Sequence, residues 1–210
     1  MRESGRRYDA ILFDFDGVLV DSEPLHFECW NQVLADYGIA LDWETYEAAF
    51  IGSSDRVMLA HYAERANPPV ALETLTGQYP RKRDLFRALM LEKLPFFENC
   101  AGFLETLEDY KLAVVSSSGR PEIEPALERA GVRGFFSALV CAADVKNHKP
   151  APDPYLLAAR LLNAQSPLVV EDSAAGEASA RAAGFDVIRV ASPAEVPERV
   201  RAALMVSASG

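Results

Sequence analysis

The apolar residues of this chain follow two patterns, one typical of buried strands and the other of amphipathic helices. Short β-rich apolar runs occur at 10–13, 112–115, 138–142, 168–170 and 187–190, and such runs are typical of strands buried on both faces. Helical apolar patterns lie between them at 121–130, 153–163 and 173–183. Because strands alternate with helices, the pattern predicts an α/β fold with a doubly wound parallel sheet.

Residues 23–93 break this alternation, because they contain consecutive helical patterns and no convincing strand. The first helix begins at Pro24, has an apolar face from Trp30 to Tyr37 with i, i+3, i+4, i+7 spacing, and ends at Gly38. Further helices are predicted at 42–50, 54–66, 71–78 and 81–92, the last after a break at Pro80. We therefore expect an α/β core formed by residues 1–22 and 94–210, and an inserted all-helical domain at residues 23–93.

Composition limits the size of the fold and the class of partner. With 210 residues, half of them hydrophobic, the chain can bury the core of one sizeable domain and a small insert. Its formal net charge of −10 argues against a nucleic acid as partner, because binding a phosphate backbone requires a basic surface. The densest basic cluster, at residues 81–83, is too short to change this conclusion.

The same composition bears on cellular location. No stretch approaches the roughly 18 apolar residues of a membrane span, and the N-terminal residues lack the long apolar segment of a signal peptide. The three cysteines are far apart and show no CxxC spacing, which indicates reduced thiols and not a disulfide framework. We expect a cytoplasmic protein without a membrane partner.

The end of the first predicted strand carries the clearest chemical signal. Asp14 and Asp16 are two residues apart, so their carboxylates point to the same face of an extended chain, and Gly17 allows the backbone to approach a ligand closely. A nucleophilic carboxylate beside a second one that can act as acid and base suits phosphoryl transfer through an aspartyl phosphate. For an isolated Asp-x-Asp, two solvated acids before a turn would be the alternative interpretation.

Other polar residues follow later strands. In open α/β sheets ligands bind outside the carboxyl ends of the strands, so we expect Ser116, Lys149 and Asp172 to meet Asp14 in one crevice. Four carboxylates beside a phosphate would repel one another and the phosphate unless a cation balanced their charge. A hard divalent cation, best matched by Mg²⁺, is therefore expected beside these carboxylates: Asp14, Asp16, Glu171 and Asp172.

The segment DFDGVLVDSE at 14–23 resembles the first motif of the haloacid dehalogenase superfamily, in the branch that contains β-phosphoglucomutase and many small-molecule phosphatases. Three later segments are similar to the other motifs, in order: VVSSS at 114–118, HKPAPDPY at 148–155 and VVEDSAAG at 169–176. The resemblance runs from Tyr8 to about Val190. It implies a Rossmann-like core and a small helical cap that closes over the active site.

The resemblance also implies roles for single residues. Asp14 would bind Mg²⁺ with one oxygen and attack phosphorus with the other. The main-chain carbonyl of Asp16 and the side chain of Asp172 would complete the protein ligands, with Glu171 contributing directly or through water. Asp16 would protonate the leaving oxygen and then take a proton from the attacking water.

The phosphoryl group needs its own partners. Lys149 would bind a phosphoryl oxygen and offset the charge of the nucleophile. Ser116, followed by main-chain N–H groups, would hydrogen-bond the phosphoryl group, and Ser117 and Ser118 are weaker candidates for the same task. Arg120 is a further candidate for binding the substrate.

His26 and Lys82 resemble the cap histidine and cap lysine of β-phosphoglucomutase, which help to hold a bisphosphate intermediate. A histidine packed within the helical insert is the alternative interpretation of His26. The mutase has an arginine that holds the distal phosphate, whereas the matching position here is Asp55, with Arg56 one residue later. Because one residue corresponds to a rotation of about 100° on a helix, this departure disfavours the mutase reaction.

Together these observations predict a Mg²⁺-dependent phosphatase of a small phosphorylated metabolite such as a sugar or polyol phosphate. A β-phosphoglucomutase-type phosphomutase is the first alternative. A non-catalytic phosphate-binding protein is the second, which the retention of all catalytic positions disfavours. A dehalogenase is not expected, because that reaction requires neither a second acid at Asp16 nor a metal. The sequence leaves the oligomeric state open and is compatible with a monomer.

Overall fold

The computed structural model describes residues 7–51 and 53–206, which form two compact units. Unit 1 comprises the described residues up to Asp21 together with those from Leu94 onward, and unit 2 comprises those from Ser22 to Lys93. Residues 1–6, where no signal peptide is expected, lie outside the described part of the chain. The chain therefore leaves unit 1 once and returns to it once.

Unit 1 is built on a parallel sheet of five strands in the order β3-β2-β1-β4-β5. The parallel α/β fold predicted from the sequence is confirmed. β3 is shorter than the predicted 138–142, because Cys141 N–H donates to the Asp144 carboxylate at 2.8 Å and the chain turns there. The strands are β1 Ala10–Phe13, β2 Lys111–Val115, β3 Ala138–Val140, β4 Pro167–Glu171 and β5 Asp186–Arg189.

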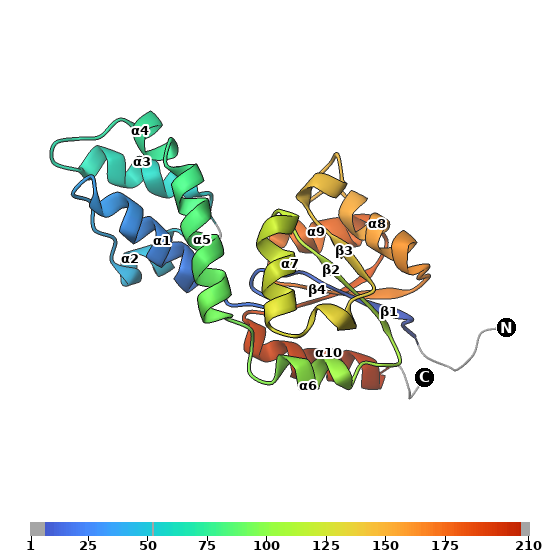
Figure 1. The fold of residues 1–210 in the computed structure, drawn as a ribbon. Helices are drawn as coiled ribbons and strands as arrows, with labels where there is room; N and C mark the ends of the chain where they lie inside the picture. Colours follow the sequence, from blue (N-terminus) through green and yellow to red (C-terminus); the bar gives the residue numbers. More distant parts are fainter. Residues whose placement is uncertain (1–6, 52, 207–210) are drawn as a thin grey trace. The chain divides into compact units, whose positions relative to one another are not determined.

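Helices connect the strands of unit 1, and α10 follows the last of them (Figure 1). They are α6 Cys100–Glu105, α7 Arg120–Arg129, α8 Asp153–Leu162, α9 Ala174–Ala182 and α10 Val196–Val206, with 3₁₀ turns at Arg133–Phe135, Ala142–Asp144 and Pro193–Glu195. The connections that contain α6 and α7 lead from β1 towards β3 at one edge of the sheet. Those that contain α8 and α9 lead in the opposite direction, towards β5 at the other edge. Because parallel crossovers are right-handed, the two pairs of helices cover opposite faces.

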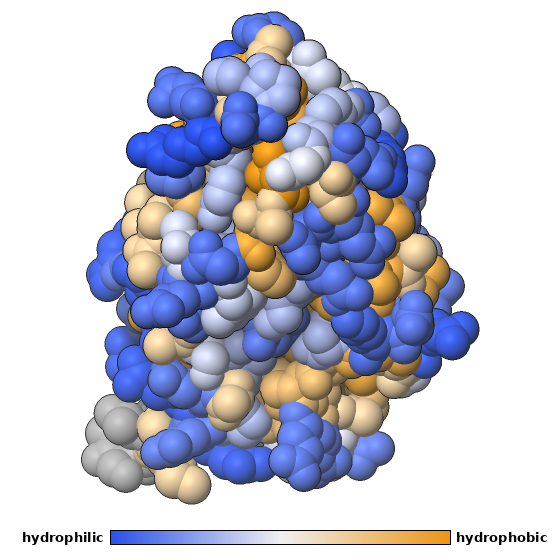
Figure 2. Space-filling model, turned by 90° about the vertical axis from the view of Figure 1, so that its left-hand side faces the viewer, coloured by the Kyte–Doolittle hydropathy of each residue, from blue (hydrophilic) through white to orange (hydrophobic). Residues whose placement is uncertain are grey.

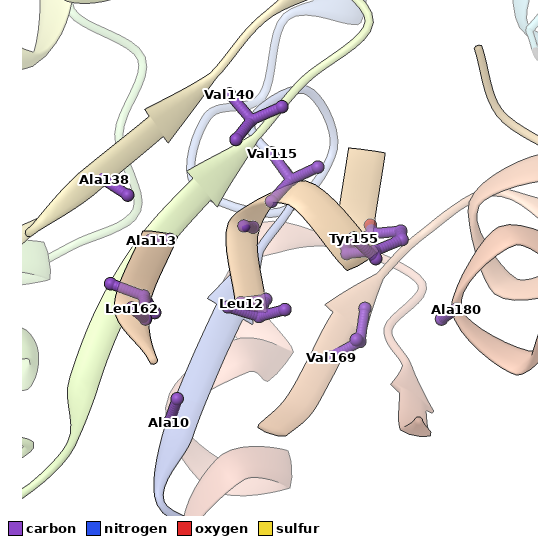
Figure 3. Packing of buried hydrophobic residues seen from close by; sticks show 11 residues of the cluster. Ala10, Leu12, Ala113, Val115, Ala138, Val140, Tyr155, Leu162, Val169 and Ala180 are labelled. Atoms are coloured by element: carbon purple, nitrogen blue, oxygen red, sulfur yellow. The ribbon is translucent and has the colours of Figure 1, made fainter. Parts of the chain in front are cut away.

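The face of the sheet beneath α8 and α9 contains the hydrophobic cluster of Figure 3. Alternate strand residues point into it, as the strand period requires, and Tyr155, Ala158 and Leu162 of α8 and Ala180 of α9 pack on them. The large Tyr155 side chain is completely buried and lies beside Val169 of β4. On the other face, Phe13 packs edge-on against Phe136 at 6.3 Å between ring centroids.

Unit 2 is all-helical in its described residues and has a core of its own. Its helices are α1 Glu23–Ala35, α2 Trp43–Ala49, α3 Asp55–Arg65, α4 Leu72–Thr76 and α5 Tyr79–Lys93. Trp30, Leu34 and Leu59 are completely buried in a cluster to which all these helices contribute. The predicted break at Pro80 is wrong: this proline lies in the first turn of α5, where its missing N–H costs no helical hydrogen bond.

One face of the surface is drawn in Figure 2, and the three cysteines lie beneath the surface. Hydrophilic residues cover most of the face drawn in Figure 2, with hydrophobic residues in patches between them. Among the described residues, no helix has the length and apolar character that a membrane span needs. All three cysteines are buried and unpaired.

Candidate active site

The site lies in unit 1, where the carboxyl ends of β1, β2 and β4 meet. Phe13 at the end of β1 is in register with Val114 of β2 and Val170 of β4, so Asp14 lies at the same level as the ends of its two neighbouring strands. The Asp14 main-chain N–H donates to the carbonyl of Val170 at 3.0 Å. In this strand order the chain leaves β1 towards one edge of the sheet and leaves β4 towards the other. The place between these two strands is the topological switch point, where α/β sheets bind ligands.

Lys149 joins the ends of three strands. Its Nζ lies 2.9 Å from Asp14 Oδ1 and 2.6 Å from Glu171 Oε1, and donates to the carbonyl of Val115 at 3.0 Å. Burial by itself would lower the pKa of Lys149, but the carboxylates of Asp14 and Glu171 together outweigh burial and raise it. The ammonium group therefore stays charged and offsets the two carboxylates beside it.

Glu171 is completely buried and is held by protein donors at both oxygens. Oε1 accepts from Lys149 and from the Tyr155 hydroxyl, each at 2.6 Å. Oε2 accepts from the main-chain N–H groups of Asp172 and Ser173 and from the Ser173 hydroxyl, at 3.0–3.2 Å. Burial favours the protonated form, but Lys149 and these donors prevail and lower the pKa of Glu171.

Two glycines let the carboxylates lie close to the main chain. A Cβ at Gly176 would lie 1.8 Å from Glu171 Oε1, and a Cβ at Gly17 would lie 2.2 Å from Asp172 Oδ2. Gly17 also has φ +71°, a left-handed conformation that side chains disfavour. The sequence analysis assigns a role to Gly17. The requirement for a glycine at position 176 follows only from where the structure places the Glu171 carboxylate.

Three carboxylates could hold a cation. One oxygen from each of Asp14, Glu171 and Asp172 lies within 4.8 Å of the others, and oxygen donors of this kind suit Mg²⁺ or Ca²⁺. Burial, followed by the charge of Glu171, raises the pKa of Asp172 to about 6. Burial also raises the pKa of Asp14, against the opposing charge of Lys149. A divalent cation would relieve this repulsion, so the donor set fits the metal that the sequence predicts.

The serines after β2 divide into buried and exposed positions. Ser116 is buried, and its hydroxyl accepts from the Ser118 N–H at 3.0 Å. The Ser118 hydroxyl donates to Asp16 Oδ2 at 3.0 Å, which links the predicted acid–base carboxylate to β2. Ser117 is exposed, and a role for it in substrate binding stays a prediction.

Arg120 has partners within unit 1. Its guanidinium donates to the carbonyl of Leu139 at 2.9 Å and to Asp144 Oδ2 at 2.8 Å. These contacts tie the first turn of α7 to the end of β3. The structure therefore gives Arg120 a structural role, and substrate binding by this residue stays a prediction.

His26 and Lys82 are neighbours in unit 2. Lys82 Nζ donates to His26 Nδ1 at 2.5 Å and lies 3.7 Å from the Asp55 carboxylate. The imidazole stacks on Phe86 with 4.4 Å between ring centroids. Burial and then the charge of Lys82 lower the pKa of His26 to about 3, so the ring is neutral and its hydrogen lies on Nε2.

Sequence reasoning missed two partners of the site residues. Tyr155 was quoted only as part of a motif, but its hydroxyl positions Glu171. Ser118 is predicted only as a weaker candidate for binding the phosphoryl group, but its hydroxyl contacts Asp16. A signal for Tyr155 was present, because a phenol on the apolar face of a buried helix needs a hydrogen-bond partner.

Comparison with known proteins identifies the family. A family described as haloacid dehalogenase-like hydrolase matches residues 11–190. Fructose-1-phosphate phosphatase YqaB of Escherichia coli is 32% identical over 189 residues, covering 88% of this chain and 97% of that protein. A phosphorylated carbohydrates phosphatase of Thermotoga maritima is 32% identical over 183 residues, covering 86% of this chain and 83% of that protein.

A solved structure supports the same assignment. A CbbY mutant from Rhodobacter sphaeroides in complex with xylulose-(1,5)bisphosphate matches with a TM-score of 0.66 at 27% identity, covering 87% of this chain and 85% of that one. Both the family match and the relatives extend over most of the chain, and the candidate site lies at the carboxyl edge of the parallel sheet. This chain belongs to the haloacid dehalogenase-like hydrolases.

Proposed function

We propose that this hydrolase is a Mg²⁺-dependent phosphatase of a small phosphorylated sugar or polyol. The observation that carries the proposal is the buried Lys149 between Asp14 and Glu171, with Asp16 two residues beyond the nucleophile. Relatives that are 32% identical are named as phosphatases of fructose 1-phosphate and of phosphorylated carbohydrates. Both names support a phosphorylated sugar as the class of substrate.

The reaction would proceed in two displacements at phosphorus. In the first, an Asp14 carboxylate oxygen attacks phosphorus, the ester P–O bond breaks, and Asp16 gives its proton to the leaving oxygen. In the second, water attacks the aspartyl phosphate, Asp16 takes a proton from that water, and the bond between Asp14 and phosphorus breaks. Inorganic phosphate leaves, and Asp14 and Asp16 return to their starting forms.

Charged and polar groups of the site would stabilise the phosphoryl group during transfer. Lys149 would bind a phosphoryl oxygen and offset the charge of the nucleophile, and Ser116 would hydrogen-bond a second oxygen. Mg²⁺ would be held by Asp14, Asp172 and the main-chain carbonyl of Asp16, and would neutralise charge on the phosphoryl oxygens. Because protein donors already occupy both Glu171 oxygens, we propose that Glu171 acts on the metal through water.

Unit 2 would act as a cap that restricts access to the site. A helical lid over a phosphatase site admits small molecules and excludes folded phosphoproteins. We propose that His26 and Lys82 help to bind the substrate from this cap. The buried, unpaired cysteines support a location in the reducing cytoplasm.

Phosphorus-31 NMR would test the proposal directly. Purified protein is incubated with Mg²⁺ and a panel of sugar phosphates that includes β-glucose 1-phosphate with a trace of the 1,6-bisphosphate. We expect a growing inorganic phosphate signal that EDTA abolishes. Glucose 6-phosphate forming without free phosphate would instead support the mutase, and no turnover of any compound would contradict both.

Two variants make this experiment specific. Asp14→Asn should abolish phosphate release and also the hydroxylamine-sensitive phosphoprotein that acid quenching traps. Asp21→Asn is the matched control, because it removes an exposed carboxylate from the same segment, and it should keep activity within about twofold. Equal activity of the two variants would contradict the role of Asp14.

A further inference from the structure

Ser118 is tied through its side chain to Asp16, a residue far away in the sequence. Its hydroxyl donates to Asp16 Oδ2 at 3.0 Å, across a separation of 102 positions in the chain. Both residues belong to unit 1 and both are partly buried, so water competes less for this hydrogen bond than at an exposed position. The contact connects the proposed acid–base carboxylate to the loop after β2.

The main chain of Ser118 is held on both sides of its side chain. Its N–H donates to the buried Ser116 hydroxyl at 3.0 Å, and its carbonyl accepts from the N–H of Ala142 at 3.1 Å. The next residue, Gly119, donates its N–H to the Glu122 carboxylate at 2.8 Å, at the start of α7. Ser118 therefore offers its hydroxyl from a fixed position.

Asp16 lies in the turn that follows β1. In this turn the N–H of Gly17 donates to the carbonyl of Val20 at 2.9 Å, and the N–H of Val20 donates to the carbonyl of Phe15 at 3.1 Å. These hydrogen bonds order the main chain around Asp16, but the two side-chain torsions of Asp16 are set by the contacts of its carboxylate. The hydrogen bond from Ser118 restricts those torsions, so it helps to direct the carboxylate before a substrate arrives.

The direction of this carboxylate matters because Asp16 gives up a proton in the first half of the proposed reaction. As the ester P–O bond breaks, the leaving oxygen keeps the electron pair of that bond and takes the proton of Asp16. The carboxylate that is formed accepts a stronger hydrogen bond than the neutral acid, because hydrogen bonds to ionised acceptors are the stronger kind. The Ser118 hydroxyl therefore stabilises the form of Asp16 that the proton transfer produces.

We propose that Ser118 is a positioning residue for general acid catalysis, which acts on the reaction through Asp16 and not by holding the transferred phosphoryl group. This inference rests on the proposed function and deepens it by giving the two serines different tasks. Ser116 would serve the phosphoryl group, and Ser118 would serve the leaving oxygen through Asp16. In the step that phosphorylates Asp14, Ser118 should then matter only for a leaving group that requires a proton.

Two phosphate donors distinguish this role from a structural one. A sugar alkoxide requires a proton to leave, whereas acetate leaves from acetyl phosphate as a stable anion. Rapid acid quenching after the protein is mixed with Mg²⁺ and either donor gives the rate of phosphoenzyme formation. For Ser118→Ala we expect formation from the best sugar phosphate of the panel to fall by at least about tenfold, within the roughly 10²–10⁴-fold that general acid–base catalysis supplies, and formation from acetyl phosphate to stay within about threefold.

Matched variants separate the hydroxyl from the shape of the side chain. Ser118→Cys nearly keeps the shape but has only a weak S–H donor, so it should show the same selective loss, whereas Ser118→Thr retains a hydroxyl and should restore the rate. Ser137→Ala is the control, because Ser137 is exposed and lies at the amino end of β3, away from the site, and it should leave both rates unchanged. Thermal melts establish which variants are folded.

A double-mutant cycle tests whether Ser118 acts through Asp16. If it does, Ser118→Ala should slow phosphoenzyme formation from the sugar phosphate by less than about twofold in an Asp16→Asn background, because the proton that it helps to transfer is already absent. The same fold-loss in the wild-type and Asp16→Asn backgrounds would overturn the inference.

The outcomes separate the inference from the function on which it rests. If the folded Ser118→Ala and Ser118→Cys proteins are slowed equally with both donors, or with neither, the inference fails and the phosphatase stands. If the wild-type protein forms no phosphoenzyme and releases no phosphate from any sugar phosphate, the proposed function fails and the inference with it.

Discussion

Replacement of Gly176 by alanine sets two physical effects against each other. Gly176 lies in the first turn of α9, and helix propensity alone would make alanine more stable than glycine by about 1 kcal/mol. The structure predicts the opposite result, because the new Cβ would lie 1.8 Å from Glu171 Oε1 and 1.9 Å from the carboxyl carbon of Glu171. Neither atom can stay in place.

The cost follows from what holds the Glu171 carboxylate. It is completely buried and accepts hydrogen bonds from Lys149 and Tyr155 at 2.6 Å, so moving it separates a buried ion pair. Breaking such a pair costs about 3–5 kcal/mol, and overpacking that is partly relieved by backbone movement costs about 1–3 kcal/mol. After subtracting the helix propensity from these two costs, we expect Gly176→Ala to lower the free energy of unfolding by about 3–7 kcal/mol.

Activity should fall with stability, because Lys149 would lose one of its two carboxylate partners. Displacement of a catalytic group by about 1 Å can reduce the rate by about 10²-fold. Urea denaturation and phosphate release measure the two effects. Gly134→Ala is the control, since nothing lies within 4 Å of the Cβ that it adds, and it should change stability by less than about 0.5 kcal/mol. A Gly176→Ala protein with wild-type stability and activity would refute the reasoning.

Three further predictions follow from buried contacts. Tyr155→Phe removes the hydroxyl that donates to Glu171 and should lower the free energy of unfolding by about 1.5–3 kcal/mol in urea titrations, whereas a loss below about 0.5 kcal/mol would contradict the assigned contact. Gly17→Ala combines φ +71° with a clash against Asp172, so we expect phosphate release to fall by at least about 10²-fold, and near-wild-type release would argue against this geometry. The pKa of His26 is lowered to about 3 from an unfolded value near 6.5, so its contribution is complete above about pH 6.5 and is lost as the pH falls toward 3. Because the imidazole is partly exposed, the wild type should lose about 1–2 kcal/mol more than His26→Asn between about pH 7 and 5, and parallel stability curves for the two proteins would contradict this shift.

The sequence predicts well those features that depend on the spacing of apolar residues and on the order of the elements along the chain. The apolar runs that become β1, β2 and β4 are short and bounded by polar residues, so their ends could be located to within a residue or two. Because parallel strands end at one edge, the meeting of Asp14 with Glu171 could be expected from those runs alone, whereas Lys149 lies on the segment between β3 and α8 and was expected there from the motif at 148–155. The structure brings these three side chains within hydrogen-bonding distance.

Contacts that depend on tertiary packing could not be predicted in this way. The Arg120 side chain binds the carbonyl of Leu139 and the carboxylate of Asp144, partners about twenty residues away whose positions follow from the turn after β3. The hydrogen bond between Tyr155 and Glu171 depends on how α8 packs on the sheet. The helix break predicted at Pro80 is wrong because a proline inside the first turn of a helix and a proline that separates two helices have the same sequence signature.

The separate cores of the two units have an evolutionary consequence. The hydrophobic cluster of unit 2 draws only on residues of that unit, and that of the sheet only on residues of unit 1. Substitutions that reshape the helical insert can therefore accumulate without disturbing the packing beneath Asp14 and Lys149. In an enzyme of this construction, new substrate ranges can arise by divergence of one inserted segment, while the bond-breaking apparatus is inherited unchanged.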